Sequence, residues 1–177
     1  MPTPPSASRP STLKRDHLVE TAFSLFYREG YHAVGIDKIL RTAGLAKMTL
    51  YHHFKSKEEL IVAALERRGV EIRELRQRNL ASAGSSPRQQ LLALFAAYEA
   101  WFNSPDFNGC AFIRAIGEFP AATSPVHQTA TAEKQILIQT LESLLTELKV
   151  KRPDRVSLHI YLLIEGGYHQ RTHLRER

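Results

Sequence analysis

The side chains best suited to chemistry in this sequence lie in one short stretch, residues 47–53. Lysine, threonine, tyrosine and histidine side chains can all donate hydrogen bonds to phosphate oxygens or to the edges of bases. The candidate contact residues are Lys47, Met48, Thr49, Tyr51, His52 and His53. No acidic residue occurs between Asp37 and Glu58. The stretch therefore predicts contact with a nucleic acid.

Two short helical patterns must position these side chains. Apolar residues at Ile36, Ile39, Leu40 and Ala43 follow helical spacing, and Gly44 then interrupts the pattern. A second pattern follows, with apolar residues at Leu45, Leu50 and Phe54. The sequence reads as helix, glycine turn, helix, an arrangement that places its second helix in the DNA major groove.

From residue 26 to residue 60 the sequence closely resembles the TetR family of bacterial transcriptional regulators. The positions that match the family pattern are Phe26, Gly30, Ile39, Ala43, Gly44, Thr49, Leu50, Tyr51, His53, Phe54, Ser56, Lys57, Glu58, Glu59 and Leu60. Two positions depart from it: Val34 and Ala46 stand where the family usually carries a hydroxyl that opens a helix. Loss of such a cap costs ~1 kcal/mol of helix stability, so we expect some loss of affinity there.

The resemblance implies a repressor that binds a palindromic operator in double-stranded DNA as a homodimer and is released by a small-molecule effector. We assign base-edge contacts to Lys47, Thr49 and His52. Phosphate contacts are assigned to Tyr51, His53 and Lys57. In the family, Lys57 stands near a phosphate at the start of a long helix, where free amides and the helix dipole also favour an anion.

All of the periodic segments are helical, so the predicted fold is all-α. We expect a flexible arm over residues 1–12, a helix-turn-helix domain over 13–60, a linker helix over 61–82 and a C-terminal effector-binding and dimerisation domain over 87–177. Helices are expected at about 14–29, from Ser56 to about 81, and at 87–103, 106–118, 125–149 and 153–175. Ser56 with Glu59, and Ser86 with Gln89, have the spacing of capping boxes.

The C-terminal segment is rich in aromatic residues and could hold a small molecule. Such pockets are mostly apolar, with a few polar groups that orient the ligand. The candidate effector residues are Tyr98, Trp101, Phe102, Cys110, Phe112, His127 and Tyr161. The alternative for each of them is an ordinary place in the hydrophobic core. The resemblance favours an effector site but identifies no ligand.

Catalysis and metal binding have weaker support. Cys110, His127 and Glu118 contain the groups of a nucleophilic triad, but no nucleophile motif surrounds Cys110 and nothing supplies an oxyanion hole. Glu165, His169 and His173 share one helix face and could bind a transition metal, yet no fourth ligand is obvious. We therefore expect no enzyme activity, no cofactor and no metal.

Two other functions remain open at this point. One is a DNA-binding protein without an effector, whose C-terminal domain would be fully packed. The other is a helical protein-interaction module that has lost specific DNA binding. The chain also stops at Arg177, within what resembles the first of two dimerisation helices in the family, so we expect either a smaller dimer interface or a shortened domain. Leu158, Tyr161 and Leu162 still offer an apolar stripe to a partner helix.

Composition agrees with a DNA-binding protein. Residues 1–60 hold nine basic residues against six acidic ones, whereas residues 87–177 hold ten against nine. The excess of positive charge therefore lies in the N-terminal part, where a polyanion would dock. The first residues lack the apolar region of a signal peptide, no apolar run is long enough to span a membrane, and Cys110 is the single cysteine. We expect a soluble cytoplasmic protein.

Overall fold

The computed structural model describes residues 9–174, and the side chains of residues 11–167. Within that range the chain forms eight helices and no strand, as the all-α prediction requires. They are α1 (Arg9–Glu29), α2 (Ile36–Ala43), α3 (Lys47–His53), α4 (Lys57–Ser82), α5 (Pro87–Phe102), α6 (Ala111–Glu118), α7 (Pro125–Glu147) and α8 (Pro153–Leu174). Residues 9–12, expected in a flexible arm, belong to α1, while residues 1–8 of that arm lie outside the described residues.

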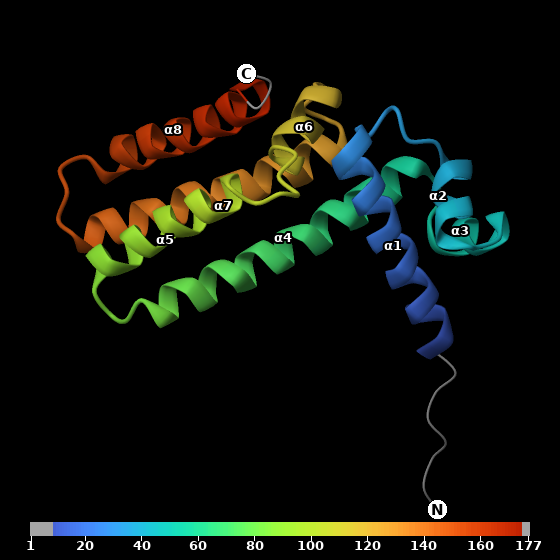
Figure 1. The fold of residues 1–177 in the computed structure, drawn as a ribbon, viewed down its shortest axis with the longest axis horizontal. Coiled ribbons are helices and arrows are strands. Elements are labelled where there is room, and N and C mark those ends of the chain that lie inside the picture. Colours follow the sequence, from blue (N-terminus) through green and yellow to red (C-terminus); the bar gives the residue numbers. More distant parts are fainter. Residues whose placement is uncertain (1–8, 175–177) are drawn as a thin grey trace, which may run out of the picture.

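The helices form a small head and a larger helical body joined by α4. Helix α1 packs against α2, α3 and α4, whereas α7 packs against α4, α5, α6 and α8. Figure 1 shows α4 running from the head, beside α2 and α3, along the length of the body. The hydrophobic core continues through both parts, since the same buried cluster includes Phe26 and Leu50 of the head and Leu94 and Leu137 of the body.

The helix ends explain most of the boundaries. At α4, the Ser56 hydroxyl accepts a hydrogen bond from the Glu59 N–H at 3.1 Å, as a capping box requires. The Glu59 carboxylate, however, accepts from the Lys55 N–H at 2.6 Å and not from Ser56. The cap expected at Ser86 is absent: Ser86 occupies the N-cap position of α5, but its side chain makes no cap hydrogen bond. Pro87 at the first helical position remains the visible start signal.

The prediction of a helix beginning near residue 106 is wrong. Helix α6 begins at Ala111, with Cys110 as its N-cap residue in an extended conformation. Gly109 has a φ of +82°, in the left-handed region that a right-handed helix cannot use. Residues 103–110 therefore form a connection of turns and extended backbone between α5 and α6.

Candidate DNA-binding face and ligand cavity

Helix α3 is held by one face and exposed on the other. Leu50 is completely buried and Phe54, just after the helix, is 2% exposed, so these two side chains anchor the helix to the head. On the opposite face, Met48 is 79% exposed and Tyr51 45% exposed. Lys47 and His52 are also exposed, whereas Thr49, His53 and Lys57 are half-buried. Of the sequence-predicted contact residues, four are therefore well exposed and three are only partly accessible.

The turn between α2 and α3 fixes the direction of this surface. Gly44 has a φ of +65° and a ψ of +30°, and the Leu45 N–H donates to the Leu40 carbonyl at 3.1 Å, which closes the end of α2. From α1, the His17 Nε2 lies 3.1 Å from the Ala43 carbonyl oxygen at the same helix end. Ala46 is the N-cap residue of α3 and has no side-chain cap, as its identity predicts.

Val34 does not occupy a cap position, which corrects the prediction for that residue. The N-cap residue of α2 is Gly35, and Val34 precedes it with its side chain completely buried. Val34 and the buried Ile39 stand at the two positions of a hydrophobic staple, N′ and N4. An apolar residue is therefore suited to this site, and no hydroxyl cap is missing.

Basic side chains lie on α3 and in the segment that follows it. Partial burial, then the neighbouring charges of His52 and Arg15, lower the pKa of His53 below its usual value. The Lys57 Nζ donates to the His32 carbonyl at 3.2 Å, and burial lowers the pKa of Lys57. This bond holds the ammonium close to the α1–α2 connection. Lys55, an exposed cation just before α4, is a further candidate contact that the sequence reasoning missed.

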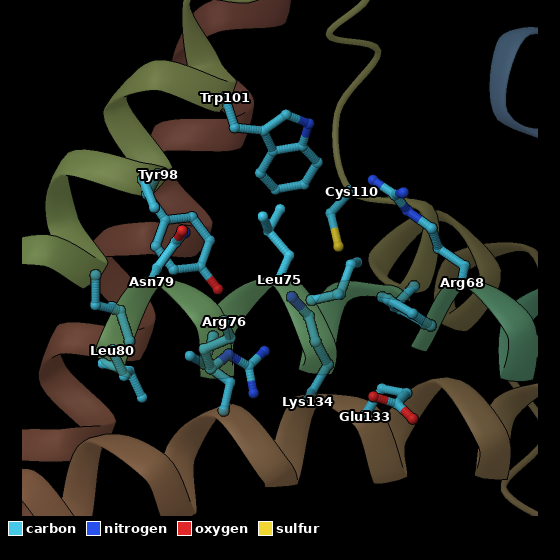
Figure 2. Close-up of a pocket in the computed structure, with 15 residues that line it drawn as sticks. Arg68, Leu75, Arg76, Asn79, Leu80, Tyr98, Trp101, Cys110, Glu133 and Lys134 are labelled. Carbon is cyan, nitrogen blue, oxygen red and sulfur yellow. The ribbon is translucent and has the colours of Figure 1, made fainter. Parts of the chain in front are cut away.

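A cavity of about 170 Å³ lies between α4, α5, α7 and the start of α6. Its lining is Arg68, Ile72, Leu75, Arg76, Asn79, Leu80, Leu94, Ala97, Tyr98, Trp101, Cys110, Phe112, Glu133, Lys134 and Leu137. Figure 2 shows Tyr98 and Trp101 entering from α5, Leu75 and Arg76 from α4, and Lys134 from α7. Four of the seven predicted effector residues, Tyr98, Trp101, Cys110 and Phe112, belong to this lining.

The other three predicted effector residues are not part of the cavity wall. Phe102 meets Phe107 edge to face, with ring centroids 5.5 Å apart. It also packs so closely against Gly167 of α8 that a Cβ there would lie 2.9 Å from the ring. The His127 Nδ1 lies 2.8 Å from the Phe119 carbonyl oxygen. Tyr161 lies behind the wall, with its ring centroid 5.6 Å from the Lys134 Nζ. Sequence spacing did not reveal which faces of α5, α7 and α8 meet at the cavity.

Ion pairs surround the cavity. Lys134 and Glu165, both largely buried, are joined by a 2.6 Å contact. Burial alone would lower the pKa of Lys134, but the Cys110 sulfur and the Glu165 carboxylate together raise it to about 12, so the ammonium stays charged. Glu133 pairs with Arg73, and Arg68 pairs with Glu71 at 3.2 Å. Glu165 is therefore engaged within the body.

The described residues do not form the alternative sites that the sequence suggested. Glu118 accepts hydrogen bonds from the Tyr31 and His32 backbone, and His127 contacts Phe119, so neither side chain is directed to Cys110 as a triad would require. Within the described part of the chain, no three His, Cys, Asp or Glu residues form a possible metal site. The side chains of His169 and His173 lie outside the described residues. Among residues 9–174, no helix has the length and apolar character needed to cross a bilayer.

Helix α6 connects the cavity wall to the head. The Tyr31 hydroxyl donates to the Ala111 carbonyl at 3.0 Å, directly between the cavity residues Cys110 and Phe112. Seven residues further on, the Glu118 carboxylate accepts from the Tyr31 N–H at 3.0 Å and from the His32 N–H at 2.6 Å. Arg114 donates to the Tyr27 carbonyl at 2.7 Å. Both ends of α6 therefore hold the end of α1 and the connection to α2.

Comparisons with known proteins agree with this architecture. A family described as "Bacterial regulatory proteins, tetR family" matches residues 18–64. The crystal structure of SCO4454, a TetR-family transcriptional regulator from Streptomyces coelicolor, is 32% identical, with a TM-score of 0.82 over 90% of this chain and 84% of that one. The HTH-type transcriptional regulator YjdC of Escherichia coli is 24% identical over 154 residues, which are 87% of this chain and 81% of YjdC.

A third relative matches about half of the chain. The HTH-type transcriptional repressor KstR2 of Mycolicibacterium smegmatis is 34% identical over 98 residues, which are 55% of this chain and 47% of KstR2. The fold of this chain is thus shared with a TetR-family regulator over 90% of its length. This chain belongs to the TetR family of transcriptional regulators and is a DNA-binding regulator of transcription.

Proposed function

We propose that this protein represses transcription by occupying a palindromic operator as a homodimer, and that a small molecule in the cavity releases it. The observation that carries the proposal is the pairing of an exposed, acid-free α3 with a cavity that α6 connects to the head. The similarity to KstR2, which is named a repressor, supports the direction of regulation.

Contacts to DNA are proposed from the positions on α3. Lys47 and His52 are exposed and Thr49 is half-buried. These three side chains would read base edges, together with the exposed and apolar Met48. Tyr51, His53 and Lys57 would bind phosphates and fix the orientation of the helix. Lys57 would reach a phosphate from its present position near the start of α4, where it already bonds to the His32 carbonyl.

Dimerisation is proposed through α8. Leu158 is 45% exposed and Leu162 56% exposed, and both lie on one helix face because they are four residues apart. Leu163 beside them is also exposed. One recognition helix makes few base contacts, so a second head about one DNA turn away (~34–36 Å) would supply the remaining affinity and impose a palindrome.

Ligand control is proposed through α6. A molecule that displaces Cys110 or Phe112 would move the start of this helix, and the Tyr31 and Glu118 bonds would carry the shift to the α1–α2 connection. Coupling free energies of about 1–3 kcal/mol are typical between two such sites. The cavity also disfavours the alternative of an effector-independent protein, for which a fully packed body is expected.

A transcription assay tests repression directly. A palindrome selected from random duplexes by the purified chain is placed across the start of a reporter promoter, and transcripts made by purified RNA polymerase are counted. We expect transcript levels to fall as the protein is added, and a Tyr51→Ala variant to lose most of this effect. A rise in transcripts would identify an activator, and unchanged transcripts on an occupied operator would contradict repression.

A further inference from the structure

Most of the cavity wall is apolar, so the main part of a ligand that lies against it should be apolar too. Leu75, Leu94 and Leu137 line it together with the rings of Tyr98 and Trp101, which lie 6.2 Å apart between centroids. The volume is about 170 Å³, close to the ~150 Å³ of an engineered apolar cavity that holds one benzene molecule. The space that this wall offers a ligand is therefore about the size of one aromatic ring.

The charged groups of the wall are almost all compensated within the protein. Arg68 pairs with Glu71, Glu133 pairs with Arg73, and Lys134 pairs with Glu165. These pairs place an opposite charge next to each group, so none of them requires a charged ligand.

Arg76 differs from these groups. Among the residues that the structure describes, no carboxylate pairs with Arg76 and no hydrogen-bond acceptor meets its guanidinium. It is half-buried in the cavity wall. Burial raises the pKa of the Tyr98 phenol, and the charge of Arg76 opposes this rise. Figure 2 shows the Tyr98 hydroxyl at the end of the ring nearer to Arg76. A cation and a hydroxyl donor thus meet at the edge of an apolar space.

We infer that the cavity binds a small aromatic carboxylate, with its ring beside Trp101 and its carboxylate on Arg76 and the Tyr98 hydroxyl. The guanidinium offers two parallel donors that match a carboxylate, and a charge-assisted hydrogen bond is stronger than a neutral one. Arg76 has already lost part of its hydration in the folded protein. Binding an anion therefore costs less desolvation of the guanidinium, and the interaction of the anion with it is more favourable than that of water. This inference rests on the proposed function, because it assigns the chemical class of the effector.

The chain supplies its own reporter, since Trp101 is its single tryptophan and lines the cavity. The test titrates the full-length protein, without DNA, with 3-phenylpropanoate and with the neutral 3-phenylpropanamide, and follows tryptophan fluorescence. We expect both to change the emission in a saturable way, with the acid binding at least about 10-fold more tightly than the amide. The two compounds have nearly the same size, so the comparison isolates the charge.

Variants of two arginines on α4 locate the charge partner. Arg76→Gln should raise the Kd of the acid to that of the amide and leave the Kd of the amide within about 2-fold, whereas Arg76→Lys should keep part of the preference. Arg78→Gln is the matched control, because Arg78 is exposed and pairs with Glu74 at the surface. It should leave both affinities unchanged.

Three results would overturn the inference. In the first, the unmodified protein binds the acid and the amide with equal affinity. In the second, Arg78→Gln loses as much affinity for the acid as Arg76→Gln does. In the third, neither compound changes the fluorescence up to about 10 mM. Each is read without DNA. A protein that fails here but still binds its operator has lost only the inferred ligand class, whereas failure to bind any operator contradicts the proposed function itself.

Discussion

At the scale of single residues, the face of α3 divides into side chains that would read bases and side chains that would bind phosphates. Thr49 is half-buried, near the anchor Leu50, and its hydroxyl and methyl group suit a base edge. We expect Thr49→Ala to lose about 1–3 kcal/mol of discrimination at one position of each half-site, with little change at the others. Fluorescence anisotropy on singly substituted operators measures this.

A matched substitution controls for the Thr49 result. Thr146→Ala removes an exposed threonine of α7 whose hydroxyl donates only to the Glu142 carbonyl of its own helix. It should leave operator binding unchanged. Equal losses on every operator in Thr49→Ala would assign Thr49 to phosphate contact instead of base reading.

His53 gives operator binding a dependence on pH. Partial burial lowers the pKa of His53 in the free protein, so the imidazole is neutral at neutral pH. A nearby phosphate favours the imidazolium and raises this pKa in the complex, so binding takes up protons and affinity should rise as the pH falls from about 8 to about 6. His53→Gln should flatten this rise.

The matched control for His53 is His127→Gln, a half-buried residue at the start of α7 that contacts the Phe119 carbonyl oxygen within the body. Its operator affinity should keep the full pH dependence. If the operator affinities of His53→Gln and of the unmodified protein rise in parallel as the pH falls, His53 does not bind a phosphate.

At the scale of elements, the angle between α2 and α3 depends on one glycine. Gly44 adopts a φ of +65°, and a Cβ built there meets nothing within 4 Å, so only the backbone conformation opposes a side chain. We expect Gly44→Ala to lower the free energy of unfolding by about 1 kcal/mol. Urea denaturation followed by circular dichroism measures it.

Gly117 supplies the comparison for Gly44. It lies within α6, its φ is not positive, and a Cβ there also meets nothing within 4 Å. Gly117→Ala should therefore leave stability unchanged or raise it by a few tenths of a kcal/mol. A Gly44→Ala protein as stable as Gly117→Ala would show that the left-handed turn is not required.

Helix boundaries could be predicted from the sequence wherever a local signal marks them. Pro87, Pro125 and Pro153 each begin a helix, and Gly44 ends one. The start of α6 was missed because its signal is the backbone conformation of Gly109, and a glycine in the sequence does not reveal its own φ. The assignment of Val34 to a helix cap failed for a similar reason, since the N-cap residue is its neighbour Gly35.

The cavity could be predicted only in part, because it depends on how helix faces meet. The aromatic residues of α5 indicated a pocket, but Ile72, Leu75, Arg76 and Asn79 of α4 were assigned only to a linker helix. Their spacing of three and four residues places them on one face, which was a usable signal. No local pattern indicated that α5 and α7 would cover that face.

At the scale of the whole molecule, Glu118 ties the body to the head, 86 residues away in the sequence from its partner His32. In Glu118→Gln the amide can accept only one of the two backbone N–H bonds, so we expect a loss of about 1–2 kcal/mol in unfolding free energy. Amide hydrogen exchange should become faster at Tyr31 and His32, in the head.

The control for Glu118 is Glu147→Gln, an exposed residue at the end of α7. It should change neither stability nor exchange in the head. Unchanged protection at Tyr31 and His32 in Glu118→Gln would mean that the link through α6 does not depend on this carboxylate.

The proposed repression requires a dimer of this chain that reads a palindrome through α3. The most direct measurement is sedimentation of the purified protein with a pool of random duplexes, followed by sequencing of the retained DNA. We predict a complex with two protein chains and enrichment of a palindrome whose half-sites lie about one or two turns apart, about 10 or 20 base pairs. A monomer that retains DNA without sequence preference would contradict dimeric recognition of a palindrome.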